Sequence, residues 1–175
     1  MRNVCIFFLL SIIISLTALG LSNPQPSFDT SDYLRIHIRA NSNSACDQAV
    51  KYEVKDEIVT ALTPVVAGCE SKAQAVSRIR AQTGNIQALT VSFLRRKGFS
   101  YGAAAEIRQE RFPTRVYDGY TLPAGEYVSL IIELGEGNGD NWWCVVYPPL
   151  CFTGSSAPVV YKSKILEMIE TWRKG

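Results

Sequence analysis

The chain has 175 residues, with 18 Lys and Arg against 16 Asp and Glu. Removal of residues 1–22, discussed next, takes away one arginine and no acid, so the remaining 153 residues (175 − 22) carry a net charge of +1 (17 − 16). This balance argues against a nucleic-acid partner, because nucleic-acid-binding domains present a basic patch. It is also too small to hold the chain on an anionic lipid surface, so we expect membrane contact through the N-terminus only. The length suits one domain of ordinary size.

Residues 1–22 are predicted to be an export leader. The stretch 4–21 has no charge, and the small residues Ala18, Gly20 and Ser22 form the pattern that signal peptidase recognises. Cleavage after Gly20 or Ser22 is one outcome. An uncleaved membrane anchor is the other, because the apolar stretch just reaches the roughly 20 residues that span a bilayer. The polar residues 23–33 that follow are predicted to be an extended linker.

Residues 34–175 are predicted to form one domain that begins with a strand and two helices. Alternation of apolar and polar residues over 34–39 predicts a half-buried strand. A helix should begin after the cap Ser44, with Asp47 reaching back as in a capping box, and end near Thr63 because a proline follows. A second helix should begin after Ser71 and end at Gly98, behind a run of basic residues.

From residue 99 onward the pattern changes to a period of two, which predicts strands. The expected strands cover 99–108, 116–117, 128–134 and 142–147, with turns at 118–119 and 123–125, and a last helix covers 162–173. The fold class is therefore predicted as α+β: a single domain with an N-terminal strand, two helices, an antiparallel sheet and a C-terminal helix.

Four cysteines follow the leader: Cys46, Cys69, Cys144 and Cys151. They allow three pairings, and the sequence alone does not choose between them. Cys144 and Cys151 flank a Pro-Pro pair that can reverse the chain and bring them together, and an exported protein can keep a disulfide. A Cys144–Cys151 disulfide and two buried thiols are therefore both open.

Catalytic and metal-binding residues are not indicated. His37 with Cys144 or Cys151 could form the nucleophilic pair of a cell-envelope Cys-His hydrolase, and this reading stays as an alternative. However, His37 lies inside a predicted strand, and no cysteine-enzyme signature surrounds Cys144. A single histidine and scattered carboxylates do not make a usual zinc site. We expect no catalytic residue, metal or cofactor.

The stretch from Gly135 to Pro149 is the predicted partner interface. Gly135 to Gly139 has the look of a phosphate-binding loop, but a strand follows it, so we expect a tight connection with positive φ. Adjacent tryptophans on a strand point to opposite faces, so one can enter the core while the other covers the far face and contacts a partner. Burial of both is the alternative. The interface candidates are Gly137, Asn141, Trp142, Trp143, Pro148 and Pro149.

Three segments resemble one known family. They are I-H-I-R-A-N-S-N-S-x-x-D-Q-A-V-K-x-x-V-K-D (Ile36 to Asp56), L-P-A-G-E-Y (Leu122 to Tyr127) and G-E-G-N-G-D-N-W-W-C-V-V-Y-P-P-L-C-F (Gly135 to Phe152). The chain is similar over these segments to stage II sporulation protein R, and the likeness runs from about Leu34 to Phe152.

The resemblance implies a role in endospore formation. Members of that family are exported from the forespore into the space between its two membranes. There they activate a membrane-embedded aspartic protease that processes the sigma-E precursor, and they carry no peptidase activity themselves. The positions of Cys144 and Cys151 match the family. A structural module that binds the cell wall is a further alternative to this signalling role.

The leader generates a direct prediction. Replacing Ile12, Ile13 and Ile14 by Asp should block export, because each charge in an apolar membrane segment costs about 2.5–3.5 kcal/mol. Alkaline phosphatase fused behind residue 175, which is active only outside the cytoplasm, should be active with the natural leader and inactive with the variant. Full activity of the variant would contradict export through this segment.

Overall fold

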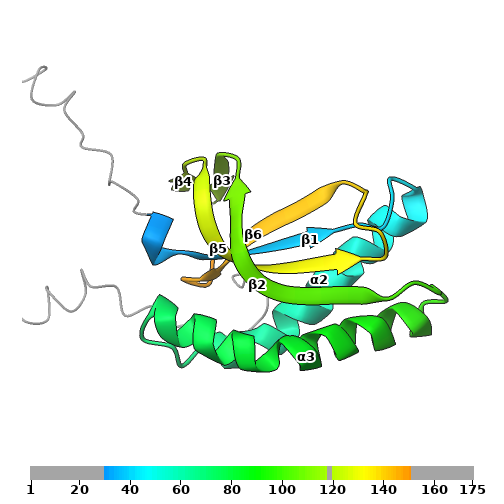
Figure 1. Ribbon diagram of the computed structural model, residues 1–175, viewed down its shortest axis with the longest axis horizontal. Coiled ribbons are helices and arrows are strands. Elements are labelled where there is room, and N and C mark those ends of the chain that lie inside the picture. The colour runs from blue at the N-terminus through cyan, green and yellow to red at the C-terminus, as the bar shows by residue number, and fades with distance from the viewer. Residues whose placement is uncertain (1–29, 118–119, 151–175) are drawn as a thin grey trace, which may run out of the picture.

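The computed structural model describes residues 30–117 and 120–150. A four-stranded sheet, in the order β2-β5-β1-β6, carries two long helices on one face (Figure 1). A short hairpin, β3-β4, forms a separate two-stranded sheet. The elements are η1 (Thr30–Asp32), β1 (Leu34–Arg39), α2 (Ala45–Val66), α3 (Lys72–Arg96), β2 (Ala103–Phe112), β3 (Arg115–Tyr117), β4 (Tyr120–Leu122), β5 (Gly125–Leu134) and β6 (Asn141–Tyr147).

The predicted α+β class is confirmed, since two helices pack on one mixed sheet. The leader, most of the linker and the C-terminal helix expected at 162–173 lie outside the described residues. Over the part of the chain that is described, no helix is long and apolar enough to cross a membrane.

Strand β1 is the centre of the sheet. It pairs in parallel with β5 (Leu34 opposite Val128) and antiparallel with β6 (His37 opposite Trp143). The expected antiparallel sheet is thus antiparallel in two of its pairings, β2–β5 and β1–β6. The β1–β5 pair is parallel. Between these two strands the chain forms α2, α3, β2 and the hairpin, a connection long enough to return it to the end of the sheet at which β1 begins.

The strand predicted at 34–39 is present, but the prediction that it is half-buried is wrong. Its apolar residues face the helices as expected, but its polar side is covered too: Arg35 is 0% exposed and His37 is 4% exposed. Only Arg39, at the end of the strand, is partly exposed. A strand with neighbours on both edges and side chains packed on both faces has no side in water.

Both helices begin at the predicted caps. The Ser44 hydroxyl accepts a hydrogen bond from the Asp47 N–H at 3.1 Å, and the Ser71 hydroxyl accepts one from the Gln74 N–H at 3.3 Å. Helix α3 ends as predicted, at Gly98 with φ of +87°. Helix α2 does not stop at Thr63: it continues to Val66 with Pro64 inside its last turn. The proline costs one intrahelical hydrogen bond and a steric contact with the preceding turn, and the burial of Leu62 and Val66 offsets this cost.

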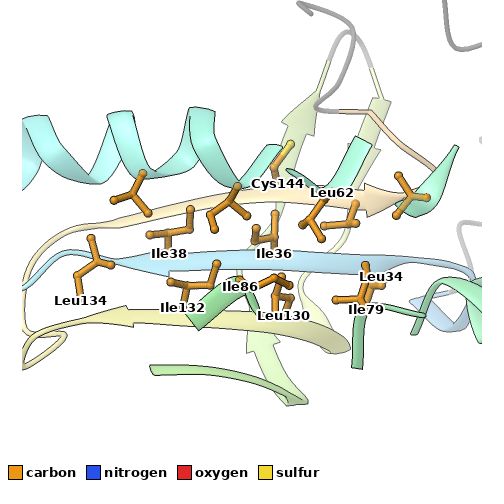
Figure 2. Packing of buried hydrophobic residues seen from close by; sticks show 14 of the residues in the cluster. Leu34, Ile36, Ile38, Leu62, Ile79, Ile86, Leu130, Ile132, Leu134 and Cys144 are labelled. Carbon is orange, nitrogen blue, oxygen red and sulfur yellow. The ribbon is translucent and has the colours of Figure 1, made fainter. Parts of the chain in front are cut away.

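The hydrophobic core lies between the sheet and the two helices. Figure 2 shows Leu34, Ile36 and Ile38 of β1 among Leu130, Ile132 and Leu134 of β5, with Cys144 of β6 nearby. The helices contribute Val54, Ile58 and Leu62 from α2 and Ile79, Ile86 and Leu94 from α3. Each fully buried side chain of this size stabilises the fold by about 1.5–3 kcal/mol.

Two loops interlock at one end of the sheet, the β1–α2 loop (40–44) and the β5–β6 loop (135–140). The Asn41 side-chain oxygen accepts a hydrogen bond from the Glu136 N–H at 3.0 Å. The Asn43 side-chain oxygen accepts one from the Asp140 N–H at 2.6 Å. The Gly139 N–H donates to the Ala40 carbonyl at 2.8 Å. These bonds fix the end of β1 against the turn that joins its two neighbours.

Asp47 binds the β1–α2 loop through its side chain. Its carboxylate accepts hydrogen bonds from Ser42 (2.6 Å), Asn41 (2.9 Å) and Tyr101 (2.6 Å). The capping box predicted for Asp47 is therefore wrong in one respect, since the carboxylate turns to the loop and to Tyr101. Burial alone would raise the pKa of Asp47, but the bonds from Ser42, Tyr101 and Asn41 outweigh it and lower the pKa below its ordinary value.

Glycine is required in the β5–β6 loop for two different reasons. Gly135 and Gly137 have positive φ, +55° and +65°, which confirms the tight connection expected from the sequence. Gly139 is constrained by space instead, because a Cβ there would lie 2.2 Å from the Ser42 carbonyl oxygen. The loops approach too closely for any side chain at this position.

We predict that Gly139→Ala destabilises the domain by about 1–3 kcal/mol, as overpacking does elsewhere. Gly84→Ala is the matched control: Gly84 lies inside α3 and a Cβ there meets nothing within 4 Å. The control should stabilise by about 0.5–1 kcal/mol through helix propensity. Urea unfolding of the two variants and the wild type measures both. Equal effects of the same sign would contradict the close approach of the loops.

Candidate functional site

The sheet has a second face, turned away from the helices, which we call the outer face. Because side chains alternate along a strand, Arg35, His37 and Arg39 of β1 lie on it. The register places residues of the neighbouring strands beside them. The outer face comprises Arg35, His37 and Arg39 of β1, Glu106, Arg108, Glu110 and Phe112 of β2, Tyr127, Ser129, Ile131 and Glu133 of β5, and Asn141, Trp143 and Val145 of β6.

A network of opposite charges crosses three strands of the outer face. The Glu110 carboxylate accepts a hydrogen bond from His37 Nδ1 at 2.9 Å and forms an ion pair with Arg39. Arg39 also reaches Glu133 at 2.9 Å, and Arg108 reaches Glu133 at 3.2 Å. Burial would raise the pKa of Glu110, but the hydrogen bond from His37 and the charges of Arg39 and Arg108 lower it below its ordinary value. The network joins β2, β5 and β1 through side chains as well as backbone.

Arg35 is enclosed by aromatic rings. Its guanidinium carbon lies 4.1 Å from the centre of the Phe112 ring and 4.8 Å from that of Tyr127. Its Nη2 donates a hydrogen bond to the Tyr117 hydroxyl at 2.7 Å. Nε and Nη1 are buried and have no acceptor. Burial lowers the pKa of Arg35, opposed by Tyr117 and Tyr127. Each unmet donor costs about 1–3 kcal/mol, and more where it is charged.

Cations and rings form a continuous stack across the outer face. Arg115 of β3 lies over Trp143 at 4.1 Å, and the Trp143 ring lies 5.3 Å from the His37 ring. His37 meets the edge of Phe112 at 5.9 Å, and Phe112 lies beside Arg35. Like Arg35, His37 has a buried nitrogen without a partner, Nε2. The hairpin and the main sheet are thus held together by cation–π contacts.

The tryptophan prediction is confirmed in its geometry. Trp142 packs against the core on the helix side, whereas Trp143 lies on the outer face. Both are partly buried, so neither is a fully exposed anchor. Among the other interface candidates, Asn141 is exposed, Gly137 and Pro148 are half-buried, and Pro149 is buried. Partner contact through these six residues stays a prediction.

The Cys144–His37 pair of the hydrolase alternative is not formed. Cys144 lies opposite Ile36, inside the core on the helix side, while the His37 side chain lies on the other face. Cys144 is also disulfide-bonded and so is not a free nucleophile. Cys46 and Cys69 are free thiols. Cys151 lies outside the described residues, and the Cys144–Cys151 disulfide stays a prediction.

Sequence reasoning missed the buried charges of the outer face. The pattern Arg-x-His-x-Arg of β1 predicts the polar side of a half-buried strand, although β2 carries a matching pattern, Glu106-x-Arg108-x-Glu110. Two strands with complementary charges at every second residue indicate that both strands present one face of the same sheet, and here β5 lies between them. Within 30–117 and 120–150, no group of three His, Cys, Asp or Glu side chains could hold a metal ion.

Comparison with known proteins identifies the family. The sequence profile of stage II sporulation protein R matches residues 30–157. The chain belongs to this family. It is 33% identical over 155 residues to stage II sporulation protein R of Bacillus subtilis (strain 168), an alignment that covers 85% of this chain and 69% of that protein. Membership supports a role in sporulation, and the family is named for that process and not for an enzymatic activity. No solved structure matches the chain.

The charge network predicts how stability depends on pH. Because the folded pKa of Glu110 is lowered, its contribution is present above the unfolded pKa of about 4.3 and is lost as the pH falls toward the folded pKa. Glu110→Gln should therefore flatten the loss of unfolding free energy between about pH 5 and pH 3.

Urea unfolding at a series of pH values measures this effect. Glu126→Gln is the control, since Glu126 is an exposed residue near the start of β5 and forms no ion pair within the described residues. The control should keep the wild-type pH dependence. Identical curves for Glu110→Gln and wild type would show that the network does not hold the carboxylate ionised.

Proposed function

We propose that this protein is a secreted signal of endospore formation, which activates a membrane-embedded aspartic protease that processes the sigma-E precursor. The observation that carries the proposal is the family match over residues 30–157, which includes the whole described domain. The activating role is what the resemblance to stage II sporulation protein R implies. The 33% identity to the Bacillus subtilis protein supports the same process in this chain.

We place the site of action outside the cytoplasm, in the space between the two forespore membranes. The leader at 1–22 supports export. The disulfide-bonded state of Cys144 supports an oxidising compartment, because disulfides are rare in the reducing cytoplasm. Both observations concern this chain itself and are independent of the family comparison.

We further propose that the protein acts by binding and not by catalysis. The outer face offers the residue types that dominate binding energy at protein interfaces, namely arginine, tryptophan and tyrosine. Trp143 and Arg115 lie together at its edge, with Arg115 exposed and Trp143 partly exposed. The helix side has no comparable cluster among the described residues, since its apolar side chains are used in the core.

Deletion of the gene tests the proposed function. Cells without the protein should divide asymmetrically yet leave pro-sigma-E unprocessed, because the protease lacks its activator. An immunoblot for sigma-E during sporulation measures the precursor and the product. The wild-type gene should restore processing, and a gene that lacks codons 2–22 should not. Normal processing in the deletion strain would overturn the assignment.

A further inference from the structure

Arg35 has hydrogen-bonding capacity that the described domain does not use. A guanidinium has five N–H bonds, and three of them, one on Nε and two on Nη1, have no acceptor here. The side chain is 0% exposed, so water does not satisfy them at the surface. Buried arginines are normally paired, so an unmet one indicates a missing acceptor.

The aromatic neighbours of Arg35 attract its charge but leave Nε and Nη1 without an acceptor. The rings of Phe112, Tyr127 and Tyr117 lie 4.1, 4.8 and 5.7 Å from the guanidinium carbon. Ring faces stabilise a cation but accept no conventional hydrogen bond. The nearby carboxylates, Glu110 and Glu133, are engaged by other cations of the outer face. Within the described residues, no ion pair with Arg35 is formed.

The unmet group is suited to a carboxylate. The planar guanidinium and the planar carboxylate form two parallel hydrogen bonds, here through Nη2 and either Nε or Nη1, a geometry that a spherical anion cannot match. A desolvated site surrounded by rings strengthens such a pair, because the surrounding dielectric is low. His37 adds a second polar atom, Nε2, which is also buried without a partner and borders the same Phe112 ring.

We propose that Arg35 is the binding residue of a carboxylate site on the outer face, and that its ligand is an Asp or Glu side chain of the protease partner. The identity of the partner rests on the proposed function; the carboxylate site does not. Tyr117 closes the site, since its hydroxyl holds Nη2 at 2.7 Å. Tyr117 belongs to the separate β3-β4 sheet, so its side chain can be displaced without breaking a hydrogen bond of the main sheet.

Titration of the full-length protein with sodium acetate tests the site directly. The Arg35 Nε–H signal in a ¹⁵N correlation spectrum, assigned by its absence from Arg35→Met, should move in a saturable manner. Sodium chloride at the same ionic strength should not move it. No saturable change with acetate, an equal change with chloride, or a change with inorganic phosphate alone would overturn the carboxylate site.

Two variants separate binding from a structural role. Arg35→Met replaces a buried charge with an apolar side chain, which is often neutral or stabilising, so it should fold and lose acetate binding. Tyr117→Phe keeps the ring and removes the competing hydroxyl. It should bind acetate about fivefold more tightly, which corresponds to one hydrogen bond of about 1 kcal/mol. Unchanged or weaker binding by Tyr117→Phe would contradict the closing role of Tyr117, and this readout does not depend on the fate of Arg35→Met.

The same variants test the partner in sporulating cells. Arg35→Met should be exported at the wild-type level and fail to restore sigma-E processing, whereas Tyr117→Phe should restore it. Restored processing by Arg35→Met would overturn the partner's carboxylate as ligand while leaving the proposed function standing. If the wild-type protein itself has no effect on processing, the proposed function fails, and the acetate titration still decides whether the site exists.

Discussion

The central position of β1 is the constraint on which the rest of the structure depends. A strand that pairs on both edges and is covered on both faces must have each of its side chains satisfied inside the protein. Its leucine and isoleucines meet this condition in the core. Its two arginines and its histidine meet it only in part, through groups supplied by other elements, because Arg35 and His37 keep buried nitrogens without a partner. The acids of β2 and β5, the aromatic rings and the hairpin are arranged around that need.

The interlocked loops explain two stretches of the sequence segments that carry the resemblance. The Asn-Ser-Asn-Ser run after β1 and the glycine-rich run after β5 bind each other through side-chain and backbone hydrogen bonds. Gly135 and Gly137 adopt the positive φ that the turn requires, and Gly139 leaves space for the backbone of the opposite loop. Hydrogen bonds within the domain therefore account for these residues. Partner contact is left to the outer face, where Asn141 and Trp143 are the sequence-predicted candidates among the described residues.

Features that depend on neighbours in the sequence could be predicted, and features that depend on distant pairing could not. The caps Ser44 and Ser71, the glycine end of α3 and the β3-β4 hairpin follow from local patterns. The burial of Arg35, the parallel β1–β5 pair and the bond between Asp47 and Tyr101 depend on partners far along the chain. The alternation of charged and apolar residues in β1 is the same in the sequence whether the charged side chains face water or a carboxylate of another strand. From the sequence, the candidate site is therefore predictable only at Asn141 and Trp143 of β6.

The topology also sets the order in which the domain can be completed. Strand β1 is synthesised early, and both of its partners, β5 and β6, are synthesised much later. Arg39 and Glu133, which lie side by side in the sheet, are 94 positions apart in the sequence. Contacts of such long range make folding slow, because a large loop must close before they form. A chain that crosses a membrane by translocation has to remain unfolded while it passes. For the export that we propose, this topology is favourable, because β1 has neither of its partner strands until β5 and β6 have been synthesised.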